Sequence, residues 1–260
     1  MLNVISKKSS ALLLGSLAFV LLFAGWWALA TYSALAKSFP SPLEVFKLFL
    51  NSFVEPIGKY TIPMHALKSL SRIFIGYVGG SVLGIVLGFI TGVSKTTNSV
   101  FRSFFTLLKS IPPIAWIPLA ILWFGLGEFS KYFIIFLGVF NFTTINAQQA
   151  AKMVDKTLVG AAKMLGADKK SVFFRVVLPS SVPQIFAGLQ VALSSSMMGV
   201  LAAEMVHSTE GLGWIIIKGM ETGNYTQIIV GMISIGIAGA IIANIMRAIE
   251  RRLCSWTIAE

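Results

Sequence analysis

Long apolar stretches alternate with short polar connections along this 260-residue chain. Each stretch has about 18 residues or more, enough for a helix to cross a hydrocarbon core of about 30 Å. We place six spans at 11–33, 67–92, 100–125, 131–150, 183–205 and 227–249. The connections leave no room for a separate soluble domain. The pattern therefore predicts a single all-α membrane domain over residues 1–260.

The first apolar stretch permits two interpretations. Lys7 and Lys8 precede it, and Ala28-Leu29-Ala30 resembles the small-x-small site of a cleaved secretory signal. The apolar core of such a signal usually has about 7–15 residues, and this stretch is longer. We therefore expect a retained first helix.

Composition supports the membrane prediction and indicates an orientation. Charged residues make up 12% of the chain and hydrophobic residues 56%, whereas a soluble domain needs more charge to cover its surface. The net charge is +11, and six basic residues between Lys152 and Arg175 fall in one predicted inside connection. Excess Lys and Arg mark cytoplasmic loops, so we predict that both termini are cytoplasmic and that the charge does not indicate nucleic acid.

The largest outside connection, residues 39–63, contains four prolines. Apolar residues recur at helical spacing between Leu43 and Phe53. We expect a short helix there that lies at the membrane interface.

Two spans carry unusual backbone residues. Glycine recurs every fourth position in the second span, at Gly76, Gly80, Gly84 and Gly88, and continues to Gly92. Such a repeat lets a neighbouring helix approach closely, either as static packing or as a sliding surface during gating. The third span contains Pro112, Pro113 and Pro118, each of which removes a backbone donor. We expect that span to be kinked and buried by protein, since freed carbonyls need partners in a membrane.

Polar residues inside the later spans are candidates for the translocation pathway. They are Asn141, Thr144, Gln148, Gln190 and Glu204. The first three share one helix face and could instead hydrogen-bond neighbouring helices. An intramembrane carboxylate usually faces the bundle interior, although Glu204 could also be an interfacial carboxylate with one polar partner.

Motifs of enzymes and metal sites are missing. The nearest piece to a P-loop, residues 92–96, lacks the required spacing. Neither His65 nor His207 has metal-ligating neighbours at suitable spacing, and no G-x-S-x-G motif occurs. We therefore expect no catalytic residue, no metal site and no cofactor bound by this chain.

The inside connection at residues 151–182 differs from the rest. Apolar residues from Leu158 onward indicate a helix that Gly166 terminates, and Asp168 is placed to cap a second short helix. Pro179 is expected to end that helix, and Pro183 to begin the fifth span. Exposed apolar residues on such a projection indicate a protein partner.

This connection resembles the coupling loop of permease subunits of bacterial ABC importers. Their hallmark is E-A-A-x-x-x-G, nine residues, then I-x-L-P. The matching positions are Ala161, Ala162, Gly166, Leu178 and Pro179, and the resemblance implies that these and Ala167 contact an ATPase subunit. Gly160 replaces the motif glutamate and Val176 the isoleucine. The contact usually made by that glutamate is therefore not carried over.

The resemblance is closest to the nitrate, sulfonate and taurine branch. It extends over residues 39–42, 109–131, 188–193 and 210–213. It implies a type I importer fold in the plasma membrane. Its partners would be two ATPases that bind ATP and Mg²⁺, a second permease copy in a homodimer or heterodimer, and an external solute-binding protein that meets residues 39–63 and 210–225. The implied substrate is a sulfonate, nitrate or similar anion, or a vitamin precursor. A secondary transporter is the alternative, but the inverted repeats that it needs are not visible.

Overall fold

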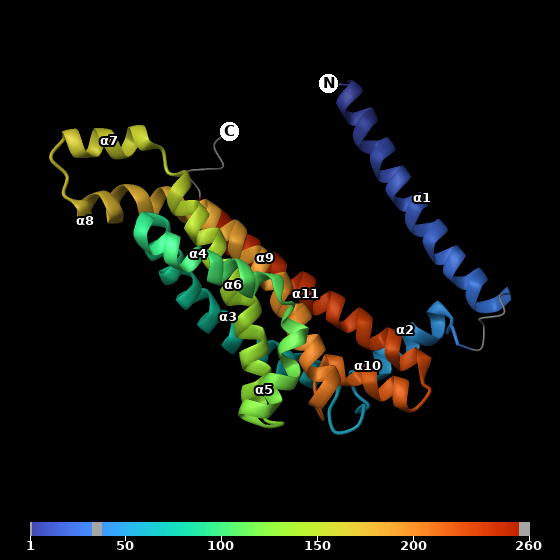
Figure 1. The fold of residues 1–260 in the computed structure, drawn as a ribbon. Coiled ribbons are helices and arrows are strands. Elements are labelled where there is room, and N and C mark those ends of the chain that lie inside the picture. Colours follow the sequence, from blue (N-terminus) through green and yellow to red (C-terminus); the bar gives the residue numbers. More distant parts are fainter. Residues whose placement is uncertain (1, 33–37, 255–260) are drawn as a thin grey trace.

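The computed structural model describes residues 2–32 and 38–254, and this part of the chain is almost entirely helical (Figure 1). The helices are α1 (Leu2–Tyr32), α2 (Pro42–Asn51), α3 (Ile62–Val93), α4 (Lys95–Ser110), α5 (Ile117–Phe124), α6 (Glu128–Met153), α7 (Lys156–Met164), α8 (Lys169–Val172), α9 (Leu178–His207), α10 (Leu212–Glu221) and α11 (Tyr225–Leu253). A 3-10 turn at Pro113–Trp116 precedes α5, and a π-helical turn at Phe173–Val177 joins α8 to α9. The all-α prediction is confirmed.

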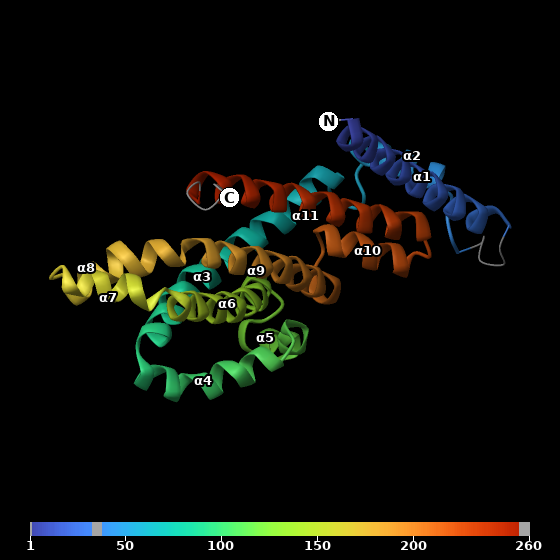
Figure 2. The same ribbon diagram turned by 90° about the horizontal axis from the view of Figure 1, so that it is seen from above.

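α6 lies at the centre of the bundle and packs against both α3 and α9. α11 packs against α9 and α10, while α4 and α5 curve around α6 (Figure 2). α7 and α8 project from one end of the bundle, which we call the coupling end, and α5 and α10 lie at the opposite end, which we call the far end (Figure 1). The chain thus places the coupling loop and the α9–α10 connection at opposite ends of α9.

The glycine repeat of α3 lies against α6. A Cβ built at Gly76, Gly80, Gly84 or Gly88 would lie only 2.6–2.9 Å from the nearest atom of α6, and Gly92 continues the contact at 2.8 Å. Side chains at these positions would hold the two helix backbones apart. The repeat therefore sets how closely α3 and α6 can approach.

Four of the described helical stretches are long and apolar enough to cross a membrane. They are Leu14–Tyr32, Ile62–Val93, Lys169–His207 and Tyr225–Leu253. α6 is not among them, because amides and hydroxyls occupy its half nearest the coupling end. The six predicted spans and the predicted orientation of the termini therefore stay predictions.

The third predicted span is broken where its prolines lie. α4 ends before Pro112, and Pro118 lies in the first turn of α5. The segments Thr96–Leu108 and Pro113–Phe124 are bent by 86° relative to each other and would form a fifth span only if taken together. The break is sharper than the expected kink, because Pro112 and Pro113 are adjacent and both lack an N–H.

Two short helices lie at the far end. α2 agrees with the helix expected near Leu43, and Ser41 and Glu44 close a reciprocal capping box at its start. α10 was not expected, since only a connection was placed between the last two spans. Its apolar face packs into the core through Leu212 and Ile215, and this burial stabilises the helix.

One sequence prediction about the coupling loop is wrong. Pro179 does not end the second helix, and Pro183 does not begin a new one. The helical stretch instead runs from Lys169 to His207. The π-helical turn just before Pro179 shifts the hydrogen-bonding pattern where that proline supplies no N–H, so the chain stays helical.

α1 stands apart from the bundle (Figure 1), and the apolar stretch Leu14–Tyr32 is not buried by any part of the described chain. Its attachment lies near the far end, where Trp26 Nε1 donates a hydrogen bond to the carbonyl of Pro40 at 3.0 Å. The Trp26 ring also contacts Phe23 and Phe39. A helix of this length and apolarity, exposed over most of its surface, fits a lipid environment.

Candidate functional site

The apex of the coupling loop is a tight turn between α7 and α8. The N–H of Gly166 donates to the carbonyl of Lys163, and the N–H of Ala167 donates to that of Ala162, each at 3.0 Å. This pair of bonds is the Schellman motif, which needs a left-handed residue after the helix, and Gly166 has φ +82°. The sequence prediction that Gly166 terminates the first helix is confirmed.

Aspartates begin both helices of the loop. Asp155 accepts from the N–H of Thr157 at 2.7 Å, and Asp168 accepts from the N–H of Ser171 at 3.1 Å. The hydroxyl and the N–H of Ser171 favour the ionised carboxylate of Asp168, and the N–H and the hydroxyl of Thr157 favour that of Asp155, so the pKa of each aspartate is lowered. The predicted cap at Asp168 is confirmed, and the loop is held by its own local bonds.

Large apolar side chains are exposed at the apex. Met164 is 89% exposed and Leu165 is 88% exposed. The space next to Gly160 and Gly166 is open, since a Cβ at either position would meet no atom within 4 Å. Of the other motif residues, Ala161 and Pro179 are exposed, and Ala162, Ala167 and Leu178 are half-buried. An ordered apolar projection of this kind indicates a protein partner.

The base of the loop is anchored in the bundle. Val172 is buried, and the ring of Phe173 contacts that of Phe89 on α3 with centroids 5.6 Å apart. α8 also continues directly into α9 through the π-helical turn. A displacement of the apex would therefore reach both α3 and α9.

A second site, which consists of polar side chains, lies at the far end. Its central residue is Arg72 of α3, which is 1% exposed. Its Nη1 donates to Glu204 of α9 at 2.8 Å and to the carbonyl of Glu210 at 3.0 Å. Its Nε and Nη2 donate to both carboxylate oxygens of Glu128 on α6, at 2.6 and 2.8 Å. One guanidinium thus joins three helices and the connection before α10.

Two lysines also belong to the group of charged side chains around Arg72. Lys131 donates to Glu128 at 2.7 Å, and Lys68 lies 3.2 Å from the Glu210 carboxylate. We call the whole set the charge cluster, and it consists of Lys68, Arg72, Glu128, Lys131, Glu204 and Glu210. It contains as many cations as carboxylates, so the formal charges balance. Such balance is what a low-dielectric site requires of buried ionised groups.

Arg72 was not among the residues predicted from the sequence, although it falls inside the predicted span 67–92. The available signal was the charge itself, because an arginine in a span needs an opposite charge from another helix. Glu204 is a carboxylate in the predicted span 183–205. Pairing the charges of the spans would have suggested this contact without a structure.

The candidate pathway residues do not line one common space. Thr144 and Gln148 line a cavity of about 400 Å³ between α4 and α6, which also contains Lys152. Gln190 lines a separate cavity of about 630 Å³ between α9 and α11, together with Arg247. These two spaces lie on different sides of the bundle.

Three of these candidates contact neighbouring helices. Asn141 is buried, with its Nδ2 3.5 Å from the carbonyl of Leu108, and Gln148 donates to Asn98 at 3.1 Å. Gln190 donates to Glu250 of α11. The contacts of Asn141 and Gln148 fit the interhelical hydrogen bonds that the sequence left open as an alternative for the fourth predicted span.

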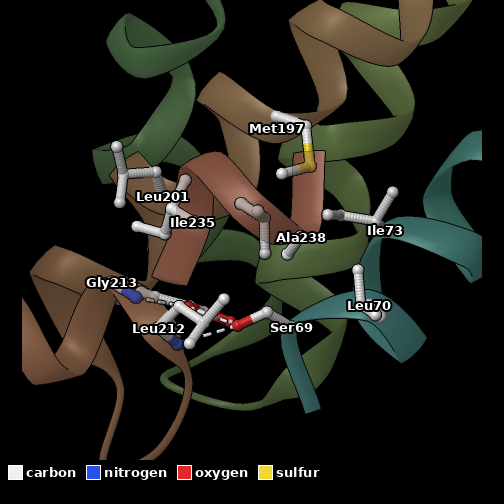
Figure 3. A pocket seen from close by; sticks show the side chains of 11 residues that line it. Ser69, Leu70, Ile73, Met197, Leu201, Leu212, Gly213, Ile235 and Ala238 are labelled. Atoms are coloured by element: carbon white, nitrogen blue, oxygen red, sulfur yellow. Dashed lines mark hydrogen bonds between the residues drawn. The ribbon is translucent and has the colours of Figure 1, made fainter. Parts of the chain in front are cut away.

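Glu204 differs from the other candidates in the number of its partners. It is 1% exposed, and its oxygens accept from Arg72, Ser69 and the N–H of Gly213. Beside it lies a small space of only about 10 Å³, which is lined mostly by apolar side chains (Figure 3). A carboxylate with this number of partners is neither an interfacial group with one partner nor part of an open passage.

Residues 80–255 match the family described as binding-protein-dependent transport system inner membrane component. The taurine transport system permease protein TauC of Escherichia coli is 32% identical over 253 residues, which cover 96% of this chain and 91% of TauC. The nitrate import permease protein NrtB of Synechocystis is 30% identical over 219 residues, which cover 82% of this chain and 80% of NrtB.

Among solved structures, an inward-facing form of the MetNI methionine ABC transporter contains a similar chain. The match has a TM-score of 0.64 at 19% identity and covers 72% of this chain and 93% of that one. At that identity the likeness concerns the fold.

Proposed function

Because this chain belongs to the binding-protein-dependent inner membrane components, the permease subunits of ABC importers of the nitrate, sulfonate and taurine branch, we propose that its coupling loop docks onto a separate ATPase subunit. The chain is a multi-pass inner-membrane transport subunit. Binding and hydrolysis of ATP with Mg²⁺ belong to the partner. This chain contributes the passage for the solute. It also contributes the surface on which the partner acts to move the helices of that passage.

The observation that carries the proposal is the apex of the coupling loop. Met164 and Leu165 are nearly fully exposed, although each would be favoured in an apolar environment. Local hydrogen bonds at Gly166 and Asp168 hold the apex in one shape. A preformed apolar projection suits a groove on a partner, because little ordering entropy is lost on docking.

The motion can then be followed through the chain. The two ATPases close on ATP, and the apex moves with the groove that holds it. Phe173 passes the displacement to α3, and the continuous stretch Lys169–His207 passes it to α9. Coupling requires that the loop fit the two ATPase states differently.

The complete importer contains two permease copies, two ATPases and an external binding protein that meets the far end. The relatives whose names include taurine and nitrate support a small solute with a negatively charged oxyacid group, a sulfonate or nitrate, as substrate. The cavity between α4 and α6 is consistent with this class, since amides, hydroxyls and Lys152 line it without a carboxylate.

The test is copurification with the ATPase subunit of the importer. Leu165→Asp and Gly166→Trp are expected to abolish copurification, because one places a charge in the contact and the other fills the open space at the turn. Leu126→Asp is the matched control, since Leu126 is 70% exposed on the connection between α5 and α6 at the far end. Retention of the ATPase by both coupling-loop variants would show that the apex is not the contact.

Uptake into membrane vesicles tests the substrate class. Vesicles that contain the complete importer and its binding protein are supplied with labelled taurine, nitrate or alanine, an amino acid that has no sulfonate group. ATP-dependent accumulation of one of the first two supports the proposal. Accumulation of alanine alone would contradict it.

A further inference from the structure

The connection before α10 is held by side chains rather than by its own backbone. Three consecutive N–H groups at the start of α10 each donate to a side chain of α3 or α9. The pairs are Gly211 with His65 Nδ1 at 3.0 Å, Leu212 with Ser69 Oγ at 2.9 Å and Gly213 with Glu204 Oε2 at 2.9 Å. Figure 3 shows the last two of these bonds beside Ser69. These N–H groups would otherwise be unsatisfied at a helix start.

Glycine is required on both sides of Leu212. Gly211 has φ +116°, and a Cβ there would collide with the Glu204 carboxylate. A Cβ on Gly213 would lie 2.8 Å from Glu204 Cβ and 2.9 Å from the carbonyl of Leu201. The motif Glu210-Gly211-Leu212-Gly213 is thus explained by contact with Glu204, and Leu212 itself lies in the core.

The charge cluster fixes this connection to the rest of the bundle. Arg72 bonds the Glu210 carbonyl directly and the start of α10 through Glu204, and it also holds Glu128 at the start of α6. Buried ion pairs contribute little net stability compared with apolar packing of the same volume. Their many directed bonds instead favour one geometry over others. A cluster of this kind is therefore suited to positioning.

α9 connects this cluster to the coupling loop. Glu204 lies near one end of α9, and α8 with the coupling-loop turn continues from the other. A displacement of the α9–α10 connection would be transmitted to the coupling loop only if that connection moves together with α9. If it were loosely attached, a partner docked at the far end would move it without affecting the coupling loop.

We infer that Arg72 and Glu204 form a fixed joint that makes the α9–α10 connection move as one body with α3, α6 and α9. Docking of the binding protein at the far end is thereby sensed at the coupling loop. This inference rests on the proposed function. Both are positioning residues, and neither touches the solute.

The first test uses Glu204→Gln in the complete importer with its ATPase. Stimulation of ATP hydrolysis by the loaded binding protein is expected to fall by roughly tenfold, within the range of about 5- to 150-fold typical of coupling between sites. Copurification with the ATPase and hydrolysis without binding protein are expected to stay at the wild-type level. Ser196→Ala is the matched control, because Ser196 is buried on the same helix α9 and its hydroxyl donates to the carbonyl of Leu193 in that helix at 2.6 Å, away from the charge cluster and from residues 210–225. Equal stimulation in the two variants would overturn the inference.

A second test does not depend on the stability of that variant. Cysteines replace Ser69 and Leu212, whose Oγ and N are 2.9 Å apart, in a chain with Cys254→Ser. A joint that stays closed predicts that the disulfide forms on mild oxidation and that transport by the oxidised importer at least equals that of the reduced one. Loss of transport on oxidation with recovery on reduction would show that the connection must open. Failure of the disulfide to form would show that the two residues are not held together, and either result overturns the inference.

The two proposals fail in different ways. If the wild-type chain does not retain the ATPase, the proposed function is wrong. If it retains the ATPase and responds to the binding protein, and Glu204→Gln responds equally, the proposed function stands and the joint does not.

Discussion

Replacing Gly88 with alanine is expected to push α3 away from α6. The added Cβ would lie 2.6 Å from both the Cβ of Ala147 and the carbonyl oxygen of Thr144. Neither atom can rotate away, since one is a Cβ and the other is backbone, so the helices must part by about 0.8 Å to reach ordinary contact. Overpacking of this kind costs about 1–3 kcal/mol. At about 2–4 °C per kcal/mol for chains near this size, the melting temperature should fall by roughly 2–12 °C.

The measurement is the thermal unfolding midpoint of the purified importer in detergent, followed by intrinsic fluorescence. Gly79→Ala is the matched control on the same helix, because its Cβ would meet only Phe136 Cδ2 at 3.6 Å. That control should leave the midpoint unchanged or raise it, since alanine is favoured over glycine in helices by at most about 1 kcal/mol. If the two variants unfold at the same temperature, α3 and α6 do not pack as described.

Three other predictions concern the far end and the coupling loop. Trp26→Phe removes the hydrogen bond to Pro40, which contributes about 1 kcal/mol. The distribution of distances between spin labels on α1 and α2 should therefore broaden, and an unchanged distribution would contradict this attachment. Gly211→Ala combines a positive φ with a collision against Glu204 and should destabilise the importer by about 2 kcal/mol or more, which an unchanged unfolding midpoint would refute. Asp168 has a lowered pKa in the folded loop, so its cap is fully present above its ordinary pKa of 3.8 and is lost as pH falls through the lowered value. Hydrogen exchange of the loop, corrected for intrinsic rates, should therefore accelerate in strong acid in the wild type but not in Asp168→Asn.

Local chemistry explains what the sequence predicted well. Gly166 and Asp168 act within a few residues of themselves, through backbone conformation and a cap, and both predictions hold. The short helix near Leu43 also follows from its apolar spacing and from the preceding Ser41. These features need no knowledge of which helices are neighbours.

Features that depend on distant parts of the chain were missed or misjudged. Arg72 and Glu204 are 132 positions apart, so their contact depends on the packing of α3 against α9. α10 is short, and its burial against α11 and α9 stabilises it more than its own sequence does. The prediction that the helix ends at Pro179 was also wrong. A π-helical turn accommodates one missing N–H donor while neighbouring helices hold the rest of the helix in place.

The unbroken helical stretch of 39 residues from Lys169 to His207 has a consequence for the size of the motion. At about 1.5 Å per residue it is roughly 58 Å long, nearly twice the thickness of a hydrocarbon core of about 30 Å. A tilt of only about 5° about its far end would displace the Lys169 end by about 5 Å, close to one turn of helix. A small change of angle beside Glu204 would then displace the end of the helix that faces the ATPase by about one helical turn, because both ends belong to one continuous helical stretch.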